Sequence, residues 1–176
     1  MWEESVDDVA KTVLKLDDVT FRRGETKILH GIDLAIGQGE HWVLIGPNGA
    51  GKSTILSFAS AQVFPTSGTV DILGERMGRV ELQALRRHIG HVNPRHPLRS
   101  NLSVRDVVLT GLTGTVERPF RWEASAEQVA KADDLIAEVG LTSRTDAGWK
   151  GLSQGERGRA LVARALIADP QLLLFD

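Results

Sequence analysis

Residues 46–54 read GPNGAGKST and fit the pattern G-x-x-x-x-G-K-[ST], which constrains the fold more than any other part of the chain. The glycines let the backbone turn tightly through positive φ angles, so that several main-chain N–H groups point at one anion. The preceding apolar segment 41–45 (HWVLI) predicts a buried strand, and a helix begins at residue 54. A strand, a phosphate-binding loop and a helix in this order predict a nucleotide-binding α/β core.

The loop also predicts which residues bind the nucleotide. We expect one continuous set to contribute, namely Gly46, Pro47, Asn48, Gly49, Ala50, Gly51, Lys52, Ser53 and Thr54. Lys52 places a positive charge near the β- and γ-phosphates, and the Ser53 hydroxyl is the expected Mg²⁺ ligand. The alternative is a chance match in a glycine-rich turn, which average residue usage makes roughly a one-in-a-hundred event in such a chain.

The composition limits the classes of protein to consider. The 176 residues suffice for one α/β domain or slightly more, and the net charge of −2 gives no overall attraction to nucleic acid or to an anionic membrane. There is no cysteine, which excludes disulfides and thiolate metal sites. No apolar run approaches about 18 residues, so we expect no membrane span in this chain.

Hydrophobic periodicity predicts a mixture of strands and helices. The expected strands are 14–21, 28–36, 41–45, 69–73, 89–92 and 171–176. The expected helices start at residue 54 and cover 81–88, 103–111, 125–139 and 157–168. The first two strands should pair antiparallel with a bulge at 17–18, whereas the continuous apolar run of the last strand is typical of a parallel sheet.

These elements predict a short lead-in followed by one domain. We expect residues 1–13 to be the lead-in and 14–176 to form the domain. Residues 94–165 should form a mostly helical block inserted into the α/β core that 14–93 supply, and 166–176 return to that core.

A second candidate binding segment, residues 151–156, reads GLSQGE and precedes a strongly predicted helix. Ser153 and Glu156 have the spacing of a capping box, and a small hydroxyl beside a bare glycine at a positive helix end can bind an anion. The alternative is an ordinary capped helix. The phosphate loop upstream favours the anion site.

Asp176 ends the last apolar strand. In phosphate-loop enzymes an acid at such a position orders Mg²⁺ and its waters, so we expect Asp176 to act at the metal together with Lys52 and Ser53. The alternative is a turn aspartate at a strand end, which is common.

In this order, GPNGAGKST, GLSQGE and LLLFD (172–176) resemble the motifs of the ATP-binding cassette (ABC) ATPases, over nearly the whole chain. The stretch GQGEHWVLIGPNGAGKST is most similar to cassettes of the molybdate- and iron-type group. The resemblance implies a P-loop core with a parallel sheet flanked by helices, an antiparallel β subdomain and an inserted α-helical subdomain. It also implies a head-to-tail dimer, in which one cassette covers the ATP of the other with Ser153, Gln154, Gly155 and Glu156.

The chain departs from the family's pattern at several positions. Where the family has an aromatic residue that stacks on adenine, this chain has Arg23, whose planar guanidinium can also stack on a base. The segment LSQGE differs from the usual LSGGQ but keeps its capping residues, so its function should survive. Asn93 stands in place of a glutamine that contacts Mg²⁺ and the transport partner, and its shorter side chain weakens the expected metal contact.

The sequence stops at Asp176, and the resemblance implies that a glutamate acting as general base follows this position. We therefore expect either a longer full protein or a truncated product. The 176 residues should bind ATP far better than they hydrolyse it. A turnover near the usual enzyme median of about 10 s⁻¹ would contradict this expectation.

The resemblance implies an ATP-binding and ATP-hydrolysing subunit of an ABC transporter, peripheral on the cytoplasmic face of the membrane and paired with separate transmembrane subunits. ATP and Mg²⁺ are the expected cofactors, and no direct contact with nucleic acid is expected. One alternative is a soluble cassette protein acting on ribosomes or nucleic acid, which a second phosphate loop would favour. The other is a nucleotide-dependent regulator that binds without turnover.

Several other polar or aromatic residues have simpler explanations. His88 and His91 would point to opposite faces of the expected strand, so with His96 they predict no metal site. Trp149 either packs the segment beside it or reaches a nucleotide across a dimer. A basic stretch without interleaved aromatics is expected to be solvated or to dock a partner, and it comprises Arg86, Arg87, Arg95, Arg99 and Arg105.

Overall fold

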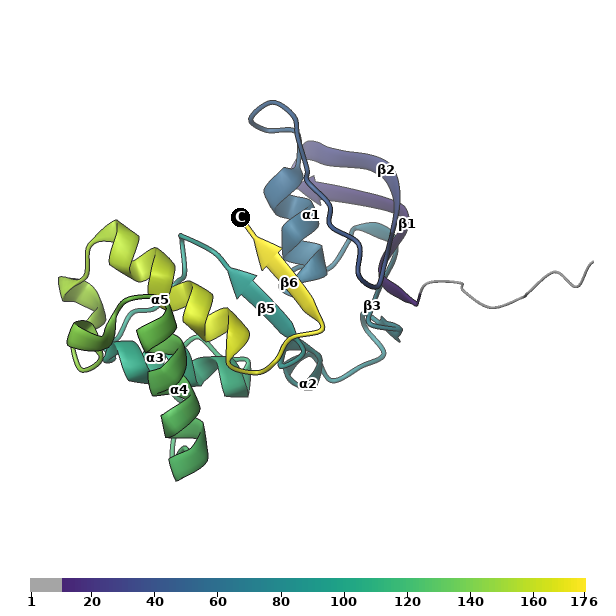
Figure 1. Cartoon of the computed structure of the whole chain (residues 1–176). Helices are drawn as coiled ribbons and strands as arrows, with labels where there is room; N and C mark the ends of the chain where they lie inside the picture. The colour runs from purple at the N-terminus through teal and green to yellow at the C-terminus, as the bar shows by residue number, and fades with distance from the viewer. Residues whose placement is uncertain (1–10) are drawn as a thin grey trace, which may run out of the picture.

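The computed structural model describes residues 11–176, and its larger sheet is antiparallel (Figure 1). This sheet contains β1 (Thr12–Arg23), β2 (Thr26–Gly37), β3 (Ser67–Ile72) and β4 (Glu75–Arg76) in the order β2-β1-β3-β4. β1 pairs antiparallel with β2 on one side and with β3 on the other. The predicted antiparallel pairing of the first two strands is confirmed, and both strands are longer than expected.

A bulge interrupts β1 at the position that the sequence predicts. The register with β2 shifts between Leu16 and Val19, and Asp18 has a φ angle of 46°. The backbone N–H of Asp18 donates to Asp33 Oδ1 at 2.8 Å, so a side chain of β2 replaces the interrupted ladder bond. Leu16 and Val19 remain buried on either side of the bulge.

A second sheet is parallel, and a candidate site residue directly follows each of its two strands. β5 (Ile89–Val92) and β6 (Leu172–Phe175) pair in parallel, with Val92 opposite Phe175. This pairing confirms the prediction made from the apolar run of the last strand. The helix α1 (Lys52–Ala59) lies between this sheet and the antiparallel one, and Phe58 near its end is fully buried (Figure 1).

The remaining helices lie within a few residues of their predicted positions. They are α2 (Leu82–Arg86), α3 (Val104–Thr113), α4 (Ala126–Glu138) and α5 (Gln154–Leu166), and short 3₁₀ turns span Thr142–Arg144 and Trp149–Gly151. Serine side chains cap the first turn of α3, α4 and α5, as the sequence predicts. Within residues 11–176 no helix is both long and apolar enough to cross a membrane.

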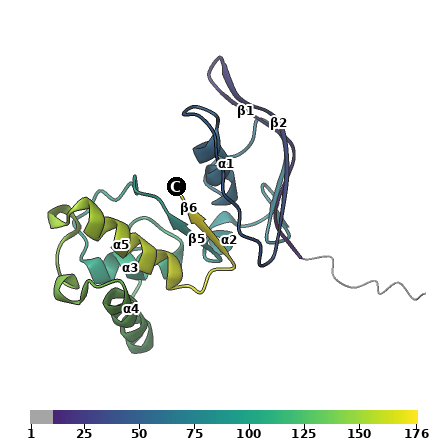
Figure 2. The same ribbon diagram turned by 45° about the horizontal axis from the view of Figure 1, so that its top comes forward.

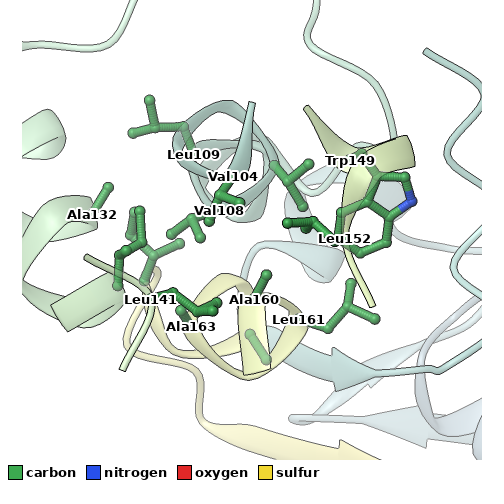
Figure 3. Packing of buried hydrophobic residues seen from close by; sticks show 14 of the residues in the cluster. Val104, Val108, Leu109, Ala132, Leu141, Trp149, Leu152, Ala160, Leu161 and Ala163 are labelled. Carbon is green, nitrogen blue, oxygen red and sulfur yellow. The ribbon is translucent and has the colours of Figure 1, made fainter. Parts of the chain in front are cut away.

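Buried side chains form two clusters, one in the helices and one beneath the antiparallel sheet. The helical cluster contains Val104 and Val108 of α3 and Leu161 of α5 (Figure 3). In the other, Phe58 of α1 packs with residues of β1 and β3. β5 borders both clusters, because Val92 belongs to the first and Ile89 packs against the second. The helices therefore have a core of their own that β5 connects to the rest.

The predicted buried strand at 41–45 is wrong. These residues form no strand, and Val43 and Ile45 are 79% and 90% exposed. A strand needs a neighbour for its backbone groups, but a cavity of about 520 Å³ lies between this segment and β6. The apolar residues of the segment therefore line that cavity instead of being covered on both faces.

A carboxylate fixes the start of this irregular segment. Glu40 accepts hydrogen bonds from the backbone N–H of Gly37 at 2.9 Å and from Trp42 Nε1–H at 2.8 Å. These bonds, the one to Gly37 foremost, hold the pKa of the Glu40 carboxyl below its ordinary value. The turn after β2 thus leads the chain along the cavity and into the phosphate loop.

Candidate nucleotide-binding site

The phosphate loop, residues 46–54, has the backbone that anion binding requires. Gly49 and Gly51 have φ angles of 86° and 89°, and Gly51 is the N-cap of α1. The φ of Gly51 is one that other residues rarely adopt, and a Cβ there would also press on the side chain of Leu29 in β2, so the position favours glycine. The first turn of α1 contains no acidic residue and no side-chain cap. Its N–H groups are therefore available to an anion at the positive end of the helix.

Lys52 lies folded over this loop. Its Nζ donates to the carbonyl oxygens of Gly46 and Pro47, each at 2.8 Å. Both acceptors are neutral, so the positive charge of the ammonium is not compensated by a carboxylate in these bonds. Within residues 11–176 Lys52 forms no ion pair, so its ammonium lies at the mouth of the loop without a paired carboxylate.

Ser53 and Asp176 meet although they are far apart in the sequence. Ser53 Oγ donates to Asp176 Oδ1 at 2.8 Å across a separation of 123 residues. The parallel sheet makes this possible, because the Asp176 N–H donates to the Val92 carbonyl at 3.1 Å and continues the pairing of β6 with β5. A hydroxyl and a carboxylate oxygen at this distance fit Mg²⁺, which prefers hard oxygen ligands and few protein groups.

Asn93 lies beside this pair but is oriented by its own loop. It follows Val92, whose partner in the sheet directly precedes Asp176. Its Oδ1 accepts the backbone N–H of Arg95 at 2.8 Å, which closes a local turn. The side chain therefore shapes the loop after β5, and a metal contact for Asn93 stays a prediction.

The segment 151–156, called here the signature segment, forms the capping box that the sequence predicts. Ser153 Oγ accepts the Glu156 N–H at 3.3 Å, and Glu156 Oε2 accepts the Ser153 N–H at 2.7 Å. The helix starts at Gln154, three residues before the predicted position, because the box itself initiates the first turn. Ser153, Gln154 and Gly155 are exposed, and a Cβ at Gly155 would meet no atom within 4 Å.

Arg144 completes the capping box, and nothing in the sequence pattern points to it. Its Nε donates to Glu156 Oε1 at 2.8 Å from the 3₁₀ turn upstream. This hydrogen bond, followed by those from Ser153, lowers the pKa of Glu156 to about 2. Glu156 is therefore ionised throughout the physiological pH range and is held in place by Arg144 and Ser153.

The chain does not bring its own signature segment to its own phosphate loop. In Figures 1 and 2 the start of α5 lies at the far side of the helical block, while the loop before α1 lies beside the antiparallel sheet. Both views separate the two segments in the same way. The two candidate binding segments therefore lie apart within this chain.

Arg23 and Trp149 occupy contrasting places. Arg23 is exposed at the end of β1, next to the turn that leads to β2, so stacking on adenine stays a prediction. Trp149 is only 6% exposed and belongs to the helical cluster (Figure 3). The guanidinium of Arg157 covers its ring at 5.6 Å from the centroid. Of the two roles open to Trp149 from the sequence, packing beside the signature segment is the one that this burial supports.

Comparison with known proteins places these features in a context. A family model described as "ABC transporter" matches residues 29–176. A Bacillus subtilis (strain 168) protein named "Uncharacterized ABC transporter ATP-binding protein YlmA" is 39% identical over 93% of this chain. The match covers 62% of that relative, so the chain spans less than two thirds of its length.

Two further relatives match to a similar extent. The "Lipoprotein-releasing system ATP-binding protein LolD 1" of Rhodopseudomonas palustris (strain ATCC BAA-98 / CGA009) is 38% identical, with 93% of this chain and 74% of that protein covered. The ATP-binding cassette MJ0796, solved as a dimer in a post-hydrolysis state bound to ADP and Pi, superposes with a TM-score of 0.80 at 29% identity. That match covers 93% of this chain and 73% of the cassette.

Proposed function

Because this chain belongs to the ABC transporter family, we propose that it binds Mg-ATP on residues 46–54 and that the whole protein is the ATP-hydrolysing subunit of a transporter. The observation that carries this proposal is the hydrogen bond between Ser53 and Asp176 beside the ammonium of Lys52. It gathers a cation, a hydroxyl and a carboxylate from distant parts of the sequence at one helix N-terminus. Phosphoryl transfer depends on such positioned charges more than on covalent chemistry.

Each residue of the loop then has a defined task. The N–H groups around Gly49 and Gly51 bind the phosphate chain, and Lys52 exchanges its bonds to two loop carbonyls for phosphate oxygens. Ser53 and Asp176 would hold Mg²⁺, which neutralises phosphate charge when it is bound. Lys52 and Asp176 are thus the catalytic residues of this proposal.

Two weaker contacts belong to the same proposal. The exposed guanidinium of Arg23 is free to stack on adenine, for which its planar shape suits it. Asn93 would approach the metal only after releasing the N–H of Arg95, so its contribution is smaller than that of Ser53 or Asp176.

We further propose that two copies bind head to tail. The signature segment is exposed and lies apart from the phosphate loop of the same chain, and its capping box leaves the N–H groups of Gln154 and Gly155 for a phosphate from outside. Ser153, Gln154, Gly155 and Glu156 would cover the γ-phosphate of ATP on the partner copy. The dimeric state of the cassette MJ0796 supports this arrangement. Loss of the γ-phosphate removes the contact that favours the closed pair.

The partners proposed for the whole protein are membrane subunits encoded separately, with this subunit peripheral on the cytoplasmic side. The support comes from relatives whose printed names are those of ATP-binding proteins of transport or releasing systems. The exposed face of the helical block would then couple nucleotide-driven closure to those subunits.

The proposal is tested by titrating a fluorescent ATP analogue into wild type and Lys52→Ala in the presence of Mg²⁺. We expect the substitution to weaken binding at least tenfold, or about 1.4 kcal/mol, because it removes a full charge from the phosphates. Lys131→Ala is the matched control, because it also removes a lysine but at a place away from the loop. Lys131 lies in α4 and forms an ion pair with Asp169, which follows α5. Equal affinity of wild type and Lys52→Ala would refute nucleotide binding at this loop.

A further inference from the structure

A small polar cavity lies at the other end of α1 from the phosphate loop. Its volume is about 60 Å³, and its polar walls are formed by Ser60, Gln62, Arg86, His91 and Arg164. Ser60 is the C-cap of α1, whereas Lys52 begins that helix, so about 12 Å of helix separates the cavity from the nucleotide site. The cavity is therefore a distinct feature and no part of the phosphate loop.

The two arginines that line the cavity have only neutral partners. Arg86 donates from Nε and Nη2 to the carbonyl oxygen of Ala61 at 3.1 and 2.6 Å. Arg164 donates from Nε to Thr110 Oγ1 at 2.9 Å and from Nη2 to the Thr115 carbonyl at 2.8 Å. Within residues 11–176 neither arginine forms an ion pair, and no described acidic residue lines the cavity.

An uncompensated charge in such a place is costly. Burial lowers the pKa of Arg164 to about 10, which leaves the guanidinium protonated at neutral pH. A desolvated cation without a counter-charge destabilises the folded state unless an anion accompanies it. The neighbouring His91 is also buried and adds a polar group to the cavity wall.

We propose that this cavity binds a compact inorganic anion, of the size of chloride or phosphate, between Arg86 and Arg164. The volume of about 60 Å³ admits such an ion and excludes a nucleotide, whose sites measure roughly 300 Å³ or more. Guanidinium groups suit the task because they remain charged and offer several donors in one plane. The Ser60 hydroxyl and the Gln62 amide supply further polar contacts on the α1 side.

The position of the cavity gives the bound ion a structural role. Its walls come from the end of α1, from α2, from β5, and from the helical block through α3 and α5. An anion would therefore connect the element that carries the phosphate loop to the helix that carries the signature segment. Its binding should fix the helical block against the core and raise the melting temperature of the whole chain.

The test compares the Tm of the chain in chloride, in phosphate and in a bulky organic anion, at equal ionic strength, pH and sodium concentration. We expect chloride or phosphate to raise the Tm by about 3 °C when the ion is at roughly ten times its Kd. The gain should be lost in Arg86→Gln and retained in Arg87→Gln, whose side chain is the exposed neighbour outside the cavity. The anion that gives the gain identifies the ligand.

Lys52→Ala separates this site from the phosphate loop, which also attracts anions. The gain should persist in Lys52→Ala, so a failure of nucleotide binding would leave this result intact. If Arg86→Gln does not fold, Ala168→Glu places a carboxylate at the cavity wall and should lower the gain more than the neutral Ala168→Gln does. An equal gain in every variant, a gain lost only in Lys52→Ala, or no gain with either ion would overturn the proposal.

Discussion

At the scale of single residues, the site depends on groups that hold one another in place. Ser53 and Asp176 share one hydrogen bond, and Lys52 occupies two carbonyls of its own loop. Each polar group is thus satisfied within the chain by a partner that phosphate or Mg²⁺ can replace. Such bonds keep the side chains near their working positions at little cost in reorganisation.

The pairing of Ser53 with Asp176 predicts a metal-dependent defect. Asp176→Asn should weaken binding of an ATP analogue about tenfold in Mg²⁺, because the amide keeps the shape but loses the charge at the metal. The loss should vanish in EDTA, where the metal contact does not exist. Titrations of both proteins with and without Mg²⁺ check this, and Asp169→Asn serves as the exposed control. A loss of equal size in EDTA would assign Asp176 a purely structural role.

The Arg144 bond to Glu156 predicts a shift that a titration can follow. In Arg144→Gln the pKa of Glu156 should rise from about 2 toward its ordinary value of 4.5, because the hydrogen bond from Arg144 contributes most to lowering it. Because the folded pKa is depressed, the stabilising contribution is present above about pH 4.5 and is lost as the pH falls toward 2. Carboxyl NMR chemical shifts measure the midpoint, and an unchanged value would show that Ser153 alone sets it.

At the scale of elements, β6 is a half-buried strand with one edge left open. Among the described strands it pairs only with β5, so its other edge presents free backbone groups. Phe175 is 58% exposed at this edge and faces the cavity beside residues 41–45. An unpaired apolar edge is a template for another strand.

We therefore expect the 176-residue chain to self-associate through β6, and Phe175→Lys to reduce this association. A charge at the strand edge disfavours pairing with a second strand. Phe64→Lys is the control, because Phe64 is 51% exposed but belongs to no strand. Sedimentation velocity over a range of concentrations measures the effect. Equal sedimentation-coefficient distributions for the two variants would show that the edge of β6 does not cause the self-association.

Periodicity and turn chemistry predicted most elements because local residues decide them. The capping boxes at Ser125 and Ser153 depend on side chains within a few positions. The failure at 41–45 has the opposite origin. Its apolar residues have strand propensity, but a strand forms only against a partner, and no propensity scale records whether one is present.

At the scale of the whole molecule, the candidate site is divided between its two ends. The motif pattern predicts a set of nucleotide-binding residues, and the parallel pairing of β5 and β6 accounts for the meeting of Ser53 and Asp176. Arg144 and the polar cavity lay beyond prediction, because both arise from tertiary contacts between segments without a shared pattern. The finer resemblance to molybdate- and iron-type cassettes stays a prediction.

The divided site predicts a variant that affects dimers alone. Gly155→Asp should abolish ATP-dependent dimerisation while leaving the affinity of the monomer for an ATP analogue unchanged, because a Cβ there meets open space within its own chain. The new carboxylate would face the γ-phosphate of the partner copy and repel it. Gly158→Asp is the matched control one turn further along α5, where a Cβ is equally free. Light scattering with and without nucleotide measures the molecular mass and hence the dimerisation. ATP-dependent dimers of Gly155→Asp would argue against the head-to-tail pairing.

The backbones of β5 and α3 each pass close to helix α5 at a glycine. A Cβ at Gly90 of β5 would come within 2.5 Å of the Ala165 carbonyl, and one at Gly111 of α3 would collide with the backbone of Arg164. Even alanine at either position would force the helix outward, at a cost of roughly 1–3 kcal/mol. In a saturation mutagenesis survey both sites would score as intolerant as Lys52, although neither lies at the phosphate loop. Intolerance at the two glycines reflects close backbone packing, whereas intolerance at Lys52 would reflect nucleotide binding. A map of sensitive positions must separate these two causes.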